Sequence, residues 1–124
     1  MKVRRAVCAL VAVGLLFAIN PPAGATVDAR MVRDVETIVR GRWAGTGDGD
    51  RAVAVFRCES GLNPLARNRR SSAFGIAQFL NSTWHSTGIT RTSNAWLQIE
   101  AAYRLYRARG WSPWVCARQR RGYR

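Results

Sequence analysis

The sequence has 124 residues, which is enough for one small domain. It carries 20 basic and 7 acidic residues, a net charge of +13. Such a charge favours anionic partners, although solubility or genome composition alone is an alternative reason for so many arginines. The chain has no phosphate-loop or dinucleotide-binding fingerprint and no internal repeat.

Residues 1–25 have the pattern of a secretory signal peptide. Three basic residues precede the 14-residue apolar run Ala6–Ile19, which is too short for a comfortable membrane span. The run is followed by Ala23–Ala25, which reads A-x-A, the pattern of a cleavage site. We therefore expect cleavage after Ala25 and secretion to the extracellular cell wall. An uncleaved anchor is the alternative.

The mature chain, residues 26–124, keeps 17 basic residues, all of them arginine, against 7 acidic ones. Outside the cell, its anionic partners would be wall polymers and membrane surfaces rather than nucleic acid. Cys58 and Cys116 remain, whereas Cys8 is lost with the signal. Two cysteines in an exported chain predict one disulfide, worth about 4 kcal/mol for a loop of this length. Two free thiols are the alternative.

The mature chain predicts a single, mainly helical domain over residues 26–116. Four stretches have the apolar spacing and the end signals of helices: 28–40, 50–59, about 76–86 and 93–109. Asp48 or Asp50 is placed to cap the second helix. The segment 62–73 lacks alternating apolar residues, so any β-structure is minimal. Residues 111–116 form an aromatic strap, and 117–124 are expected to be a disordered basic tail.

Glu59 is the most informative single residue. If 51–59 is helical, 100° steps place Glu59 on the same apolar stripe as Ala52, Val55 and Phe56. Burial and the negative end of the helix dipole both disfavour an ionised carboxylate. Both therefore favour the protonated form, which is the form that a general acid requires. The alternative is a partly buried glutamate paired with an arginine.

Metal and nucleophile sites have little support. Asp48, Asp50 and Glu59 fall on calcium-loop positions, but Ala52 and Val53 occupy positions where that loop needs a ligand and a glycine. His85 is the only histidine, without a ligand cluster or a serine–aspartate set, and is expected at the surface. The sequence therefore predicts no metal and no cofactor.

Five tryptophans in a small domain indicate either a sugar-binding groove or bulky core packing. We expect Trp96 and Trp114 in the core. Trp84 and Trp111 are candidates for lining a groove, with burial as the equal alternative.

Three segments together resemble the soluble lytic transglycosylase branch of the lysozyme superfamily. They are Glu59–Asn68 (ESGLNPLARN), Ser72–Phe79 (SAFGIAQF) and Ser82–Trp84 (STW). The C-terminal part is more similar to the catalytic domain of resuscitation-promoting factors. The residues that carry this second similarity are Cys58, Gln98-Ile99, Gly110–Trp114 and Cys116.

The resemblance covers about 50–116 and departs from the families at three places. The usual Y-N-x-G stretch is missing, the strap is one residue shorter before Cys116, and the loop before Gly75 is basic, with Arg67, Arg69 and Arg70. These departures leave the branch and the sugar subsites open.

The resemblance implies a lysozyme-like α+β fold with minimal β-structure and Glu59 as the sole catalytic carboxylate. Ser60 would steady the turn after it, and Gly75 would let the backbone approach the ligand closely. Three polar side chains would line the groove and hydrogen-bond the sugars: Gln78, Thr83 and Gln98. Helix capping for Thr83 and a surface position for either glutamine are the alternatives.

The implied activity is cleavage of the β-1,4 bond between N-acetylmuramic acid and N-acetylglucosamine in peptidoglycan, by a lytic transglycosylase or muramidase. Since no second carboxylate is placed to share the face of Glu59, a one-carboxylate mechanism is expected. Peptidoglycan strands would be the partner of a monomer, with other wall hydrolases as candidate partners. A non-catalytic glycan-binding wall protein and a cationic wall- or membrane-active protein are the alternatives.

Overall fold

The computed structural model describes residues 28–119, and the expected signal peptide and residues 120–124 lie outside them. Within the described residues there are five helices: α1 (Ala29–Trp43), α2 (Gly49–Ser60), α3 (Asn81–Thr87), α4 (Ala95–Arg109) and α5 (Val115–Arg118). The β-structure in this part of the chain consists of two isolated bridges, Arg67 with Phe74 and Phe74 with Phe79. The predicted fold class, mainly helical with minimal β-structure, is confirmed.

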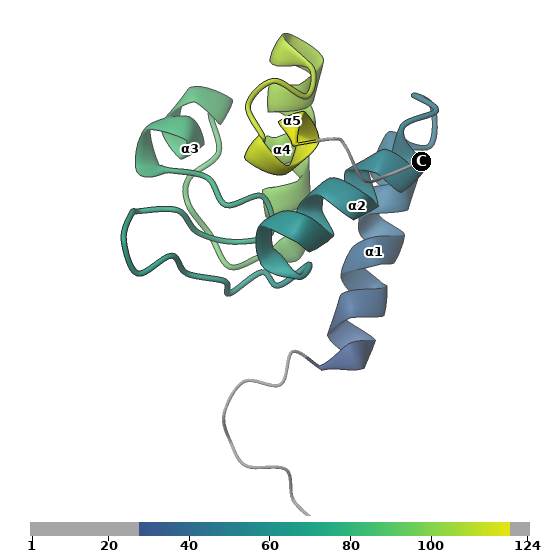
Figure 1. Cartoon of the computed structure of the whole chain (residues 1–124), viewed down its shortest axis with the longest axis horizontal. Helices are drawn as coiled ribbons and strands as arrows, with labels where there is room; N and C mark the ends of the chain where they lie inside the picture. The colour runs from purple at the N-terminus through teal and green to yellow at the C-terminus, as the bar shows by residue number, and fades with distance from the viewer. Residues whose placement is uncertain (1–27, 120–124) are drawn as a thin grey trace, which may run out of the picture.

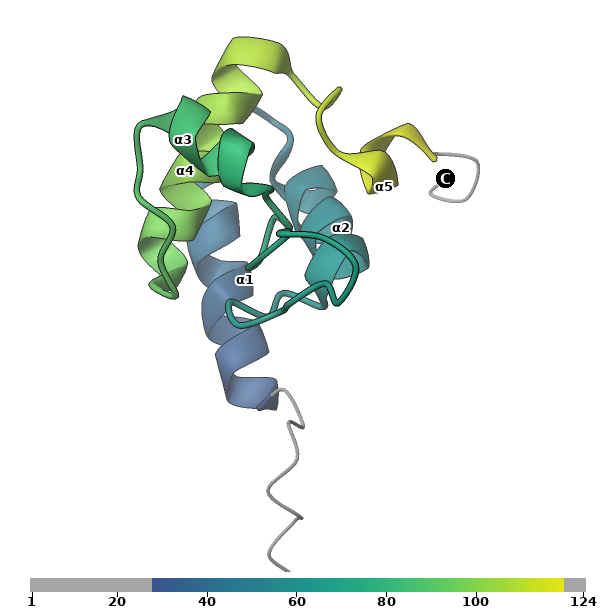
Figure 2. The ribbon, with the colours of Figure 1, turned by 90° about the vertical axis from the view of Figure 1, so that its left-hand side faces the viewer.

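Helices α1 and α2 pack against each other, α4 packs on α1 and α3, and α5 packs on α2. Figure 1 shows α1 and α3 on opposite sides of the domain, with α2 and α4 between them. The segment that joins α2 to α3 lies in front in Figure 2. None of the helices within 28–119 is long and apolar enough to cross a lipid bilayer.

The core is built around aromatic rings. Trp43 is fully buried at the end of α1 and makes an edge contact with Phe56 of α2 and a stacked contact with Trp111. The carboxylate of Asp48 accepts hydrogen bonds from the Tyr106 hydroxyl at 2.9 Å and from the Trp111 indole at 3.0 Å. Asp48 occupies the N-cap position of α2 but makes no side-chain capping bond. Its carboxylate instead ties the aromatic strap to α4.

The helix expected over about 76–86 begins at Asn81 instead. Residues 74–79 form a tight loop in which Phe74 and Phe79 exchange backbone hydrogen bonds. Gly75 and Gln78 have positive φ angles of 83° and 51°, which cannot continue a right-handed helix. These backbone angles, rather than side-chain periodicity, determine where α3 starts.

Three further expectations are corrected. Trp96 is 65% exposed because it lies about 100° around α4 from the inward stripe at Ala95, whereas Trp114 is buried as expected. Helix α1 extends to Trp43 rather than ending at 40. Part of the expected disordered tail is helical, since α5 includes residues 117 and 118.

Candidate active site

Glu59 lies in the last turn of α2 and is half-buried. The helix ends directly after it because Gly61 and Leu62 both take left-handed conformations, with φ of 65° and 61°. Leu62 is fully buried, and this packing holds its unfavourable backbone angle in place. Ser60 donates its hydroxyl to the Ile76 carbonyl at 2.7 Å, so the turn after Glu59 is tied to the loop that precedes α3.

One oxygen of the Glu59 carboxylate is held by the first turn of α5. The backbone N–H of Cys116 donates to Glu59 Oε1 at 3.0 Å. The predicted disulfide between Cys58 and Cys116 is present, with the two Cα atoms 6.0 Å apart. Because the disulfide joins α5 to Cys58, the residue before Glu59, it holds the start of α5 beside the Glu59 carboxylate. The Cys116 N–H lies in the first turn of α5, where it has no partner within its own helix, and it donates to that carboxylate instead. Within residues 28–119, no hydrogen bond or ion pair reaches Oε2, and no arginine pairs with Glu59.

A pocket of about 420 Å³ opens beside Glu59. Its walls come from the end of α2, the 77–80 loop, α3, the end of α4 and α5. Five polar side chains share this lining with Glu59: Gln78, Thr83, Arg109, Ser112 and Arg118. The two arginines were not predicted. They lie on the last residue of α4 and the last residue of α5, where sequence alone suggests solvated helix ends.

Gln78 and Thr83 lie where a groove role requires them. Gln78 is half-buried, and its amide donates to the carbonyls of Ala66 at 3.2 Å and Gly75 at 2.8 Å. This leaves its carbonyl oxygen without a partner in the described part of the chain. Thr83 is within α3 rather than at its N-cap, which is Leu80. Both residues can therefore present an oxygen to a ligand in the pocket.

Gln98 does not line the pocket, and its expected contact with sugars is corrected. Its side chain is 1% exposed, donates to the carbonyls of Pro64 at 2.7 Å and Thr92 at 2.8 Å, and accepts from the Ile76 N–H at 2.7 Å. It is a buried brace between α4 and two loops. A Cβ on Gly75 would lie 2.5 Å from Gln98 Oε1, so Gly75 is needed for this brace rather than for a ligand.

The two candidate groove tryptophans also lie away from the pocket beside Glu59. Trp84 is 3% exposed, packs edge-on against Phe79 and borders a second pocket on α3. Trp111 is half-buried within the aromatic core and donates to Asp48. The buried alternative is therefore the better description of Trp84, and core packing that of Trp111.

Glu59 is the sole acidic residue in the lining of its pocket. Glu36 pairs with Arg40 and Arg57 on the α1–α2 face. Glu100 pairs with Arg42, whose hydrogen bond lowers the pKa of Glu100 against the opposing effect of burial. No group of three or more potential metal ligands occurs in the described residues. The arrangement offers one carboxylate, neutral hydrogen-bonding groups and two cations.

A family model described as a transglycosylase-like domain matches residues 47–117. This is more than half of the chain, and the chain therefore belongs to the transglycosylase-like domain family. The match includes the acid, every residue of its pocket lining except Arg118, and both cysteines of the disulfide. Neither a curated protein nor a solved structure matches the chain.

Proposed function

We propose that this domain is a secreted peptidoglycan-cleaving enzyme that breaks the β-1,4 bond between N-acetylmuramic acid and N-acetylglucosamine, with Glu59 as its single acid and base. The proposal rests on the hydrogen-bond partners and the surroundings of the Glu59 carboxylate. Oε1 is fixed by a backbone N–H, Oε2 has no protein partner in the described residues, and the pocket lining contains no second acid. Membership of the transglycosylase-like family supports the same chemistry.

In the first step, protonated Glu59 gives its proton to the glycosidic oxygen as the bond from that oxygen to the anomeric carbon breaks. The substrate's own N-acetyl oxygen stabilises the positive anomeric carbon, as in substrate-assisted glycosidases. Ionised Glu59 then takes the proton from the muramyl 6-hydroxyl, whose oxygen bonds to the anomeric carbon and closes a 1,6-anhydro ring. Water in place of that hydroxyl gives hydrolysis.

The remaining pocket groups have complementary tasks in this proposal. The free carbonyl of Gln78 accepts hydrogen bonds from sugar substituents, and the hydroxyl of Thr83 can either donate to them or accept from them. Arg109 and Arg118 supply positive charge for the carboxylates of the peptide stems that the strand carries. The wall is reached by export, which the N-terminal pattern and the disulfide both support.

The decisive experiment is mass spectrometry of muropeptides released from purified peptidoglycan by the wild-type protein and by Glu59→Gln. The variant keeps the shape but cannot donate the proton, so we expect a loss of about 10²-fold or more. Glu100→Gln is the matched control, because it neutralises a half-buried glutamate away from the pocket. Anhydro ends indicate transglycosylation and reducing ends hydrolysis.

Unchanged cleavage by Glu59→Gln would refute the assignment of the acid. Binding of glycan without any product, the same in both proteins, would favour a non-catalytic wall protein. Antibacterial activity that survives heat denaturation would favour a cationic wall- or membrane-active protein instead.

A further inference from the structure

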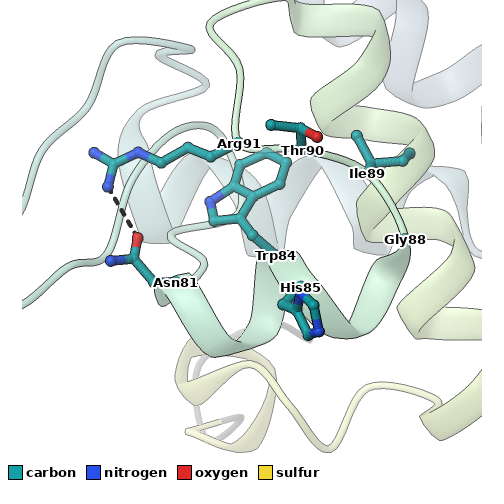
Figure 3. Close-up of a pocket in the computed structure, with 7 residues that line it drawn as sticks. All are labelled: Asn81, Trp84, His85, Gly88, Ile89, Thr90 and Arg91. Carbon is teal, nitrogen blue, oxygen red and sulfur yellow. Dashed lines mark hydrogen bonds between the residues drawn. The ribbon is translucent and has the colours of Figure 1, made fainter.

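A second pocket lies on a different face of α3 and shares no lining residue with the pocket beside Glu59. It has a volume of about 480 Å³ and lies between α3 and residues 88–91 (Figure 3). Its polar lining includes Asn81, Trp84, Thr90 and Arg91, and no acidic residue lines it. His85 also borders it, but its ring projects from the other side of the helix in Figure 3, away from Asn81 and Arg91.

The indole N–H of Trp84 is a buried donor without an acceptor. The side chain is 97% buried, and its Nε1 has no hydrogen-bond partner among residues 28–119. In Figure 3 the nitrogen edge of the ring is turned toward the side of the pocket where Asn81 and Arg91 lie. Buried donors are almost always paired in native proteins. Trp43 and Trp114 also have indole N–H groups that are unpaired within the described residues, but of the three only Trp84 lines this pocket, where its N–H can donate to a ligand oxygen.

Arg91 is a cation held in place without an anion. One guanidinium nitrogen donates to Asn81 Oδ1 at 3.1 Å, and the group lies 4.4 Å from the centre of the Phe74 ring. Arg67 lies over the same ring at 5.3 Å, so the two positive groups are within about 10 Å of each other. Neither has a carboxylate partner in the described residues. Both side chains are exposed, so salt screens much of their mutual repulsion, and both can pair with a ligand anion.

We infer that this pocket, which we call the α3 oxyanion pocket, binds a carboxylate or phosphate group of a cell-wall polymer. Arg91 has donors left beyond the one that Asn81 uses, and the Trp84 N–H and Thr90 hydroxyl add further donors. The inference rests on the proposed function only for the source of the anion. An α-helix is about 10–12 Å across, so a strand in the groove beside Glu59 can reach the other side of α3 with a charged substituent.

The test monitors the indole cross-peaks of ¹⁵N-labelled Glu59→Gln protein by NMR, so that no turnover occurs. Trp84→Phe identifies the Trp84 peak among those of the five tryptophans. Three probes are titrated: a muramyl disaccharide that carries its peptide stem, chitobiose, which has no lactyl group and therefore no carboxylate, and inorganic phosphate. We expect the Trp84 peak to move saturably with the peptide-bearing probe if stem carboxylates are the source, or with phosphate if wall phosphates are. Chitobiose should leave it unmoved.

The charge dependence gives a second criterion. Arg91→Gln should raise the dissociation constant about tenfold or more, whereas Arg91→Lys, which keeps the charge, should raise it less. Arg33→Gln removes the same charge from an exposed position on α1 and should change it less than about twofold. A Trp84 peak that moves with none of the anions, or moves equally in Arg91→Gln, overturns the inference. Wall cleavage by the wild type is measured separately, so that either conclusion can fail without the other.

Discussion

The disulfide is expected to have two effects, one on the stability of the fold and one on the position of Glu59, and its removal tests both. We consider the double variant Cys58→Ala with Cys116→Ala. The bond closes a loop with a sequence separation of 58 residues. The chain-entropy model gives about 4 kcal/mol for a loop of this length. In a domain this small, that is a large part of the free energy of unfolding, so the midpoint of thermal unfolding by circular dichroism should fall sharply.

The same substitution should also slow the reaction in molecules that remain folded. Without the disulfide, the short helix α5 is held only by its packing on α2, and the Cys116 N–H no longer stays fixed at Glu59 Oε1. Misplacing a catalytic group by about 1 Å costs on the order of 10²-fold in rate. We therefore expect a clear loss of turnover at about 10 °C, measured as muropeptides released per folded molecule.

The control for stability alone is Ile99→Ala. Ile99 is 1% exposed and does not line the pocket beside Glu59, and its truncation should cost about 2–5 kcal/mol. This variant should melt early but cleave at close to the wild-type rate when folded. Full activity of the folded double-alanine variant would refute the argument that the disulfide positions the acid.

Three further substitutions test the Gln98 brace and the ion pairs of Glu100. Gly75→Ala introduces a Cβ at 2.5 Å from Gln98 Oε1 and at a φ of 83°, so denaturant unfolding should show a loss of about 2–4 kcal/mol. Combining it with Gln98→Ala should cost less than the sum of the two single changes, and strict additivity would contradict the clash. The hydrogen bond from Arg42 lowers the pKa of Glu100 below its ordinary 4.5, so its stabilising contribution is present above that pH and lost as the pH falls. Glu100→Gln should flatten this part of the stability profile between about pH 5 and 3, and an unchanged profile would contradict it.

The sequence predicted what depends on neighbouring residues. The apolar stripe of α2 and the glycine at its end are local, so Glu59 could be placed on the inward side of a helix that stops just after it. The disulfide followed from two cysteines in a chain that was expected to be exported. The loop before α3 could not be predicted in the same way, because Gln78 takes a positive φ that its residue type disfavours.

The surroundings of Glu59 depend on contacts between residues far apart in the chain. Its carboxylate is held by an N–H that lies 57 positions away, and the turn after it by a carbonyl 16 positions away. Gln98 shows why such contacts mislead a prediction from pattern. It begins the inward side of α4 and was expected to contact sugars, yet the loop carbonyls of Pro64 and Thr92 close over it. The sequence pattern does not distinguish the amide of Gln98, which is buried with three partners, from the amide of Gln78, which lines the pocket with one free oxygen. What distinguishes Gln78 from Gln98 is the path of the loop around Gly75. We therefore expect the alanine variant of Gln78 to lose glycan affinity directly, whereas the alanine variant of Gln98 should lose it because the fold is less stable.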